Sequence, residues 1–299
     1  MVLPIFRRIL HVLKTNHDTL PPLLWFALLW LVSALYLLRQ GHLLPLALAT
    51  AAFLFWGLHT WLSGRVTSTP AVTSASAGVR RWQSWLQIMV ILFFAAIANQ
   101  PLPLWGELVA WLRTLGEQTL PVVWVGGPGN ALANPVQYFV LPLLVLLVLG
   151  AKPDELGLQW GQGTGRVCAV WLLLPVVTFG ILVGMGQIPA QTLARRLLGN
   201  ALQNGFFEEF LFRGALQSRL VKVLSPAWAL VTQALVFGIW HLNANLAMFG
   251  GDWPSALAWC IVSQAMIGLL FGLLFQRTRS LIAPSVAHVI TNTVGQTVG

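Results

Sequence analysis

Charge is scarce in this sequence: Asp, Glu, Lys and Arg together make up 8% of its 299 residues, and only eight residues are acidic. An ordinary soluble domain has roughly 25% charged residues, so this scarcity excludes that class. Hydrophobic residues reach 57%, and the mean hydropathy is +0.76. The apolar runs are continuous, which excludes a membrane β-barrel, because barrel strands alternate apolar and polar residues. The composition therefore predicts an all-α, polytopic helical transmembrane bundle.

Cysteine is almost absent as well. Cys168 and Cys260 both fall inside apolar runs, with no CxxC neighbour and no zinc-like spacing. This excludes a disulfide framework and favours two small buried side chains. The net charge of +9 could suggest nucleic acid, but the basic residues are scattered in short loops between apolar runs. We interpret them as signals of membrane topology and expect no nucleic-acid partner.

Apolar runs of helix-spanning length predict about nine spans. They cover residues 22–38, 43–62, 82–98, 134–150, 166–186, 201–218, 227–247, 254–275 and 281–297. With a cytoplasmic N-terminus, all but four of the seventeen Lys and Arg residues fall on the inner side, as the positive-inside rule requires. The four on the outer side are Arg39, Arg113, Arg195 and Arg196.

A stretch of small polar residues with one proline, 63–81, predicts a flexible linker. It divides the chain into an N-terminal two-span hairpin with its linker, residues 1–81, and a seven-span core, residues 82–299. Within the core, residues 102–118 carry charged residues and tryptophans among leucines. This pattern predicts an amphipathic helix on the outer surface and not a span.

Two adjacent carboxylates, Glu208 and Glu209, lie within one apolar run. A charged side chain at mid-membrane depth costs roughly 2.5–3.5 kcal/mol and usually marks a functional site with a partner nearby. Arg213 is four residues after Glu209, so the two can form an ion pair on one helical face. Glu208 faces elsewhere on the helix and needs a partner from a different helix.

Only two of the six histidines lie deep in apolar runs, His241 and His288. Each is followed four residues later by an asparagine, Asn245 and Asn292, so each pair would present two polar groups on one face. Phe237, four residues before His241, extends its face. Together with the two glutamates, these residues predict one shared polar site inside the membrane.

Three polar motifs thus follow one another on three separate apolar runs. They are Glu208-Glu209-x-x-x-Arg213, Phe237-x-x-x-His241 and His288-x-x-x-Asn292. In this order they resemble the signature of the CAAX-protease and bacteriocin-processing family, also called the Abi family, of glutamate-type intramembrane endopeptidases. The resemblance covers residues 205 to the end, with all motifs within 205–292. The chain differs from the family by its additional N-terminal hairpin and by ending just after the third motif, where members with eight core spans have one more helix.

The resemblance implies a catalytic mechanism without cofactor or metal. Glu208 would be the general base that deprotonates a water, and His241 would hold this water with it. The pair of Glu209 and Arg213 would limit repulsion and fix the helix. The hydrogen-bond donors to the oxyanion would be His288 and Asn292. The partners would be the lipid bilayer and a membrane protein or peptide, such as a prenylated tail, a leader peptide or a sorting signal. The short loops and the lack of a large soluble domain predict a bacterial plasma membrane as the location.

Three other functions compete with this interpretation. Two histidines and a glutamate can bind zinc, although no HExxH motif is present. A non-catalytic membrane scaffold or bacteriocin-immunity protein could use the same fold to bind a peptide. A transporter could relay protons through carboxylates at the midplane, but the two halves of the chain do not mirror each other.

Overall fold

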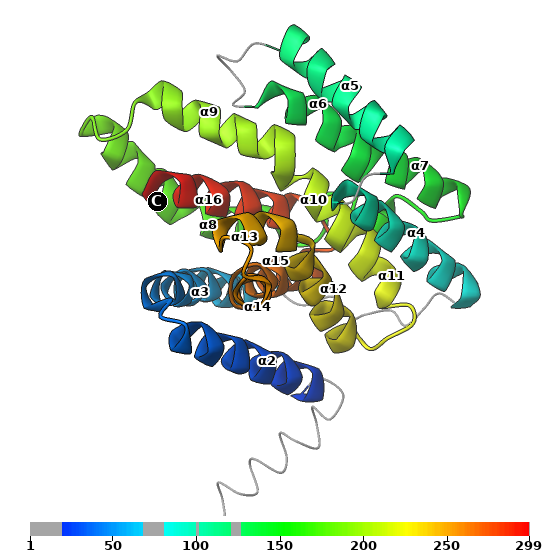
Figure 1. The fold of residues 1–299 in the computed structure, drawn as a ribbon, viewed down its shortest axis with the longest axis horizontal. Helices are drawn as coiled ribbons and strands as arrows, with labels where there is room; N and C mark the ends of the chain where they lie inside the picture. Colours follow the sequence, from blue (N-terminus) through cyan, green and yellow to red (C-terminus); the bar gives the residue numbers. More distant parts are fainter. Residues whose placement is uncertain (1–19, 68–80, 100–101, 121–126, 299) are drawn as a thin grey trace, which may run out of the picture. The chain divides into compact units, whose positions relative to one another are not determined.

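The computed structural model describes residues 20–67, 81–99, 102–120 and 127–298. Every regular element in these ranges is helical, which confirms the all-α fold (Figure 1). Six helices are long and apolar enough to cross a membrane. They are Leu20–Arg39 (α2), Leu43–Val66 (α3), Arg81–Asn99 (α4), Pro128–Val148 (α6, η1 and α7), Thr164–Gly184 (α8) and Trp253–Thr278 (α14, η5 and α15). The chain is therefore a polytopic helical membrane protein, while the count of nine spans and the cytoplasmic N-terminus stay predictions.

The other three predicted spans are shorter or interrupted helices. Residues 201–220 form η3 (Ala201–Gly205), α10 (Phe207–Glu209), η4 (Phe210–Gln217) and α11 (Ser218–Leu220). The run 227–247 is divided into α12 (Pro226–Trp240) and α13 (Leu242–Met248), and 281–297 forms α16 (Ile282–Val298). These three segments hold the three polar motifs, so the polar groups of the motifs also reduce the length or the hydropathy of their helices.

The chain folds into two compact units, each built from two separate parts of the sequence. Unit 1 comprises Met1–Phe53 and Leu220–Leu269, and unit 2 comprises Leu54–Arg219 and Leu270–Gly299. The predicted division into 1–81 and 82–299 stays a prediction. Of the predicted linker, α3 continues through Val66 and α4 begins at Arg81, while residues 68–80 lie outside the described residues.

Unit 1 is held together by close helix packing. Phe26 of α2 is buried against Val231 and Ala234 of α12 and against the end of η5 (Cys260–Ala265). A Cβ atom on Gly238 would lie 2.6 Å from the Cys260 carbonyl oxygen, so only glycine allows α12 and η5 to approach this closely. Cys260 is a free, buried thiol as predicted, whereas Cys168 in unit 2 is free but only half-buried.

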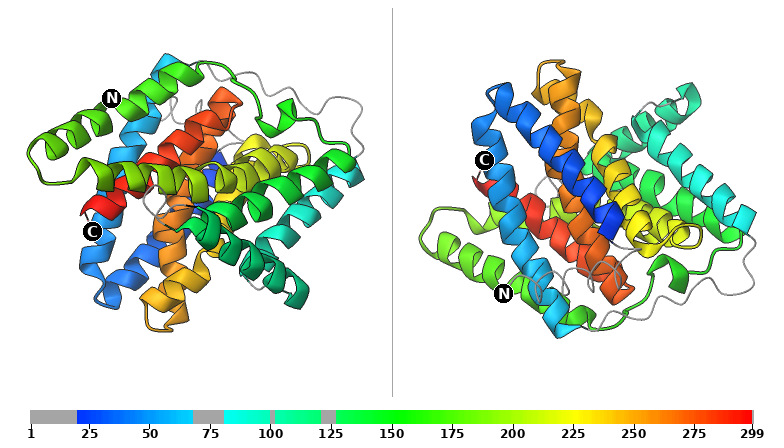
Figure 2. Two further views of the ribbon diagram at one scale, coloured as in Figure 1. Left: turned by 90° about the horizontal axis from the view of Figure 1, so that it is seen from above. Right: turned by 90° about the horizontal axis from the view of Figure 1, so that it is seen from below.

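Unit 2 contains α5 (Pro103–Thr119), which confirms the helix predicted at 102–118; its place on the outer surface stays a prediction. α5 lies beside α6 (Pro128–Pro135), and a Cβ on Gly116 would clash with the Pro128 carbonyl oxygen at 2.4 Å (Figures 1 and 2). α9 (Ala190–Asn200) and α16 pack side by side (Figure 1). Through η3, α9 leads directly into α10, and this continuity positions the carboxylates against α16.

Candidate active site

The two glutamates lie in a short α-helical turn between two π-helical stretches. Phe207–Glu209 forms α10, with η3 before it and η4 after it. π-helical turns are rare and occur frequently at functional sites. Both carboxylates are buried: Glu208 is 6% exposed and Glu209 is fully enclosed. The site therefore combines an unusual backbone with two buried acidic groups.

Glu209 forms the predicted ion pair with Arg213. Arg213 Nη1 donates to Glu209 Oε1 at 2.9 Å, and both side chains are fully buried. The guanidinium carbon lies 5.5 Å from the centre of the Phe271 ring, which adds a cation–π contact. One glutamate is thus neutralised within its own helical segment.

His288 of α16 supplies the partner from another helix. Its Nδ1 atom lies 2.8 Å from Glu209 Oε1, and its Nε2 atom lies 3.9 Å from Glu208 Oε2. An ionised carboxylate only accepts hydrogen bonds, so Nδ1 is protonated and donates the hydrogen bond to Glu209. The imidazole, which is 5% exposed, therefore lies between the two carboxylates.

Asn292 lies one turn after His288 on α16 and is half-buried. Its side chain forms no hydrogen bond with the described residues. Within this part of the protein, its amide N–H groups therefore form no hydrogen bond and could donate to a ligand. The assignment of Asn292 to the oxyanion stays a proposal.

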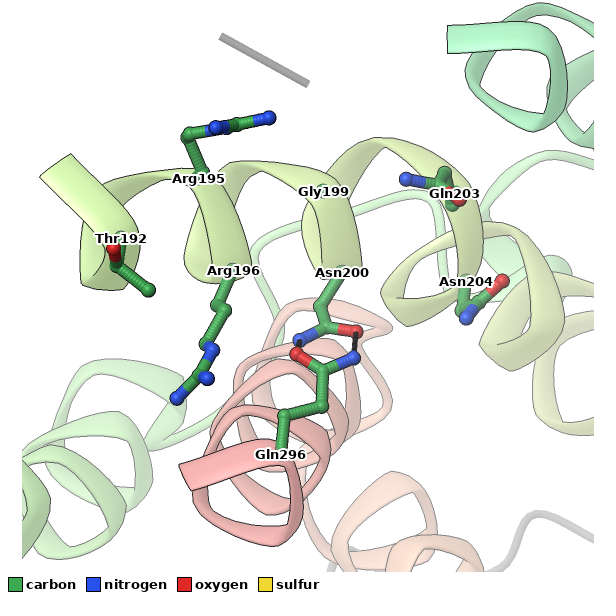
Figure 3. A pocket seen from close by; sticks show the side chains of 8 residues that line it. All are labelled: Thr192, Arg195, Arg196, Gly199, Asn200, Gln203, Asn204 and Gln296. Atoms are coloured by element: carbon green, nitrogen blue, oxygen red, sulfur yellow. Dashed lines mark hydrogen bonds between the residues drawn. The ribbon is translucent and has the colours of Figure 1, made fainter. Parts of the chain in front are cut away.

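A polar seam, defined here by Asn200, Glu208, His288 and Gln296, extends away from the carboxylates between two antiparallel segments. At one end Glu208 is near His288, and at the other end Asn200 and Gln296 exchange two amide hydrogen bonds of 3.1 and 3.4 Å (Figure 3). Asn200 also donates to Thr293 Oγ1 at 3.1 Å.

The sequence reasoning missed Asn200 and Gln296. The signal that could have found them is the four-residue spacing of two polar series, 200, 204, 208 and 288, 292, 296. A second asparagine joins the α9 side of the site from α6: Asn134 donates to the Gln203 carbonyl at 2.9 Å and to Asn204 Oδ1 at 3.3 Å.

His241 belongs to unit 1, where it interrupts the predicted span 227–247. Its Nδ1 donates to the Phe237 carbonyl at 2.8 Å, and its ring contacts that of Phe237 at 4.8 Å between centroids. In a continuous helix the backbone N–H of His241 would donate to the Phe237 carbonyl, which here accepts from the imidazole. The backbone N–H of His241 donates instead to Gly238 O, at 3.1 Å. α12 therefore ends at Trp240, and the continuous helix expected there is wrong.

Asn245, four residues after His241, is engaged with η5. Its side chain bonds to Gln264 Oε1 at 3.2 Å and to Cys260 Sγ at 3.1 Å, which fixes α13 to η5. The shared site expected from the sequence would take residues from both units, so the place of His241 beside Glu208 stays a prediction. Within the described ranges, no group of three or more His, Cys, Asp or Glu side chains has an arrangement that could hold a metal ion.

A helical membrane protein with a buried glutamate–histidine–arginine cluster is the class that this fold and site define. A family model described as "Type II CAAX prenyl endopeptidase Rce1-like" matches residues 190–294. This match confirms the resemblance that the three motifs predict, and it includes all six predicted site residues. The matched family is one of membrane-integral proteases, which supports a peptidase. No curated protein and no solved structure matches the chain.

Proposed function

We propose that this protein is an intramembrane endopeptidase that hydrolyses a peptide bond with a water activated by Glu208. The observation that carries the proposal is a pair of adjacent, buried carboxylates that share one histidine. Glu209 Oε1 accepts from both Arg213 and His288, at 2.9 and 2.8 Å, and His288 Nε2 lies 3.9 Å from Glu208 Oε2. Glu209 is assigned to holding the site together, because it joins two helical segments, and Glu208 to the chemistry, as the resemblance implies.

The proposed reaction begins with proton transfer from water to Glu208. The oxygen of this water attacks the carbonyl carbon of the scissile amide and forms a tetrahedral oxyanion. The proton on Glu208 then moves to the amide nitrogen as the C–N bond breaks, which releases an amine and a carboxylic acid. The charge balances without an external reductant or oxidant.

The remaining residues position the water and stabilise the oxyanion. His241 is assigned to the water, together with Glu208. Since His288 Nδ1 is bound to Glu209, the role of oxyanion donor is assigned to Nε2, which donates only from the doubly protonated imidazolium. The Asn292 amide, which has no bond to the described residues, is the second donor. Such donors commonly contribute about 10²–10³ in rate each.

The membrane setting and the family match support a membrane-associated substrate. We propose a membrane-associated protein or peptide, with prenylated tails, leader peptides and sorting-signal tails as the three candidates. The short loops between apolar helices support a bacterial plasma membrane as the location.

The test is cleavage by the purified protein of three membrane-tethered peptide sets, one for each candidate class, with the products identified by mass spectrometry. Wild type should cleave at least one set, and Glu208→Gln should not. Glu107→Gln is the matched control, because Glu107 is an exposed acid on α5. Extensive chelation should leave the activity intact. Loss of activity with chelator and its return with zinc would favour a zinc protease, and equal activity of Glu208→Gln would favour a scaffold with a contaminating protease.

A further inference from the structure

A pocket of about 270 Å³ lies on α9, at the end of the polar seam away from Glu208. Its lining comes from three elements: Thr192, Arg195, Arg196 and Asn200 of α9, Gln203 and Asn204 of η3, and Gln296 of α16 (Figure 3). All of these side chains are polar and none is acidic. The pocket is therefore rich in hydrogen-bond donors and carries positive charge.

The two arginines have no carboxylate partner among the described residues. Arg196 Nη1 donates to the Thr297 hydroxyl at 2.9 Å, and neither Arg195 nor Arg196 forms an ion pair with any residue in the described part of the chain. They are also two of only four basic residues on the predicted outer side, so the positive-inside rule does not account for them. Two half-buried cations without a carboxylate partner indicate an anionic ligand.

The position of α9 indicates where this anion comes from. α8 has 21 residues and is apolar enough to cross a membrane. At 1.5 Å per residue its length is about 31 Å, which matches the hydrocarbon core of a bilayer. α9 begins six residues after α8 ends at Gly184. The pocket consequently lies close to the level of the lipid headgroups.

We propose that this pocket binds the phosphate group of a phospholipid headgroup, a chemistry that free inorganic phosphate shares. Donors from three elements suit a tetrahedral phosphate, whose oxygens point in several directions, better than a planar carboxylate that one guanidinium can engage by itself. A phosphate held by Arg196 and Gln296 would link α9 to α16. Binding would then stabilise the two segments that position Glu208 and His288.

The experiment measures lipid retention and thermal stability of the full chain. Delipidated protein is transferred to nanodiscs of phosphatidylglycerol or of a glycosyl diacylglycerol with the same acyl chains, and retained lipid is counted by native mass spectrometry. In a separate arm, inorganic phosphate is added to the protein in detergent at constant ionic strength. Wild type should retain the phospholipid and not the glycolipid, with a Tm higher by roughly 3–6 °C.

Variants locate the site. Arg195→Gln with Arg196→Gln should lower phospholipid retention by about tenfold or more, the loss expected for charge-assisted hydrogen bonds, and Arg196→Lys should restore part of it. The matched control is Arg166→Gln, which removes an exposed arginine of α8 outside the pocket and should retain lipid like wild type. If only inorganic phosphate raises Tm, the site is assigned to the free anion.

Three outcomes would overturn the proposal. One is equal retention of glycolipid and phospholipid by wild type, a comparison that needs no variant to fold. Another is an equal loss of phospholipid in Arg166→Gln and in the double variant. The third is displacement of the lipid by a peptide with a free carboxylate but not by its amide or by phosphate. None of these measurements depends on peptidase activity, so the pocket and the proposed function are tested separately.

Discussion

His288 and Glu209 are joined by a 2.8 Å hydrogen bond from Nδ1 to Oε1, and the same carboxylate oxygen accepts from Arg213 Nη1 at 2.9 Å. One buried oxygen thus connects α16 to the segment that carries the EExxxR motif. We assign Glu209 to a structural junction and the neighbouring Glu208 to proton exchange during the proposed reaction. The first two predictions separate these roles.

Replacement of Glu208 by glutamine should abolish most of the activity and leave the fold intact. Glutamine keeps the shape but removes the base, so turnover should fall by about 10²–10⁴. Stability should hardly change, because a neutral amide is less costly to bury than a carboxylate. Cleavage assays and thermal unfolding of the same preparation provide the measurement. A variant that cleaves as well as wild type would show that Glu208 is structural.

Glu209→Gln should lower both folded yield and activity. It leaves Arg213 as a buried cation without its ion-pair partner, and breaking a buried pair from one side costs about 3–5 kcal/mol. The double variant Glu209→Gln with Arg213→Gln should recover part of the yield, because no charge then remains unpaired. Folded yield by size-exclusion chromatography and Tm of Glu209→Gln, Arg213→Gln and the double variant, each compared with wild type, form a double-mutant cycle. Additive losses would contradict the ion-pair role.

Asn200 of the polar seam and Asn292 of α16 should respond to substitution in different ways. Asn292→Ala should lower kcat by about 10²–10³, the effect of removing one oxyanion donor, with little change in Tm. Asn200→Ala should lower Tm, since Asn200 bonds to Gln296 and Thr293 in α16. The comparison requires kcat and Tm for both variants. Equal losses of stability would assign Asn292 to packing and not to catalysis.

Gly205 allows the close approach of η3 to α16. A Cβ atom there would lie 2.4 Å from Val289 Cγ2 and 3.1 Å from the Asn200 carbonyl oxygen. Because Val289 follows His288, Gly205→Ala should displace the histidine from the carboxylates and destabilise the protein by about 1–3 kcal/mol. Gly180→Ala on α8 is the matched control, as a Cβ there meets nothing within 4 Å. A Gly205→Ala protein with wild-type Tm and activity would contradict this packing.

Membrane topology is open to a direct test. A reporter inserted at Ser74 should be cytoplasmic, and one fused after Gly299 should lie on the outer side. The reason is that an odd number of predicted spans lies between the two positions. Alkaline phosphatase and green fluorescent protein fusions at both positions provide the measurement. Both reporters on one side would mean that the count of nine spans is wrong by one.

Several features of this protein follow from the sequence alone. Scarce charge and long apolar runs determine a helical membrane protein. A continuous apolar run can cross lipid only as a helix, because a helix satisfies its backbone hydrogen bonds within the same segment. The four-residue spacing of Glu209 and Arg213 determines their ion pair, since helical geometry places them on one face. The order of three motifs was sufficient to predict the family that matches residues 190–294.

Tertiary structure alone decided which groups meet across helices. The sequence required a partner for Glu208 from another helix, but only the antiparallel packing of α9 and η3 against α16 places His288 there, between both carboxylates. The end of α12 at Trp240 likewise depends on the bond of the His241 ring to Phe237 O, which competes with the helical pattern. Side-chain periodicity describes one helix at a time, whereas register between helices depends on which small residues, such as Gly205, let two backbones approach.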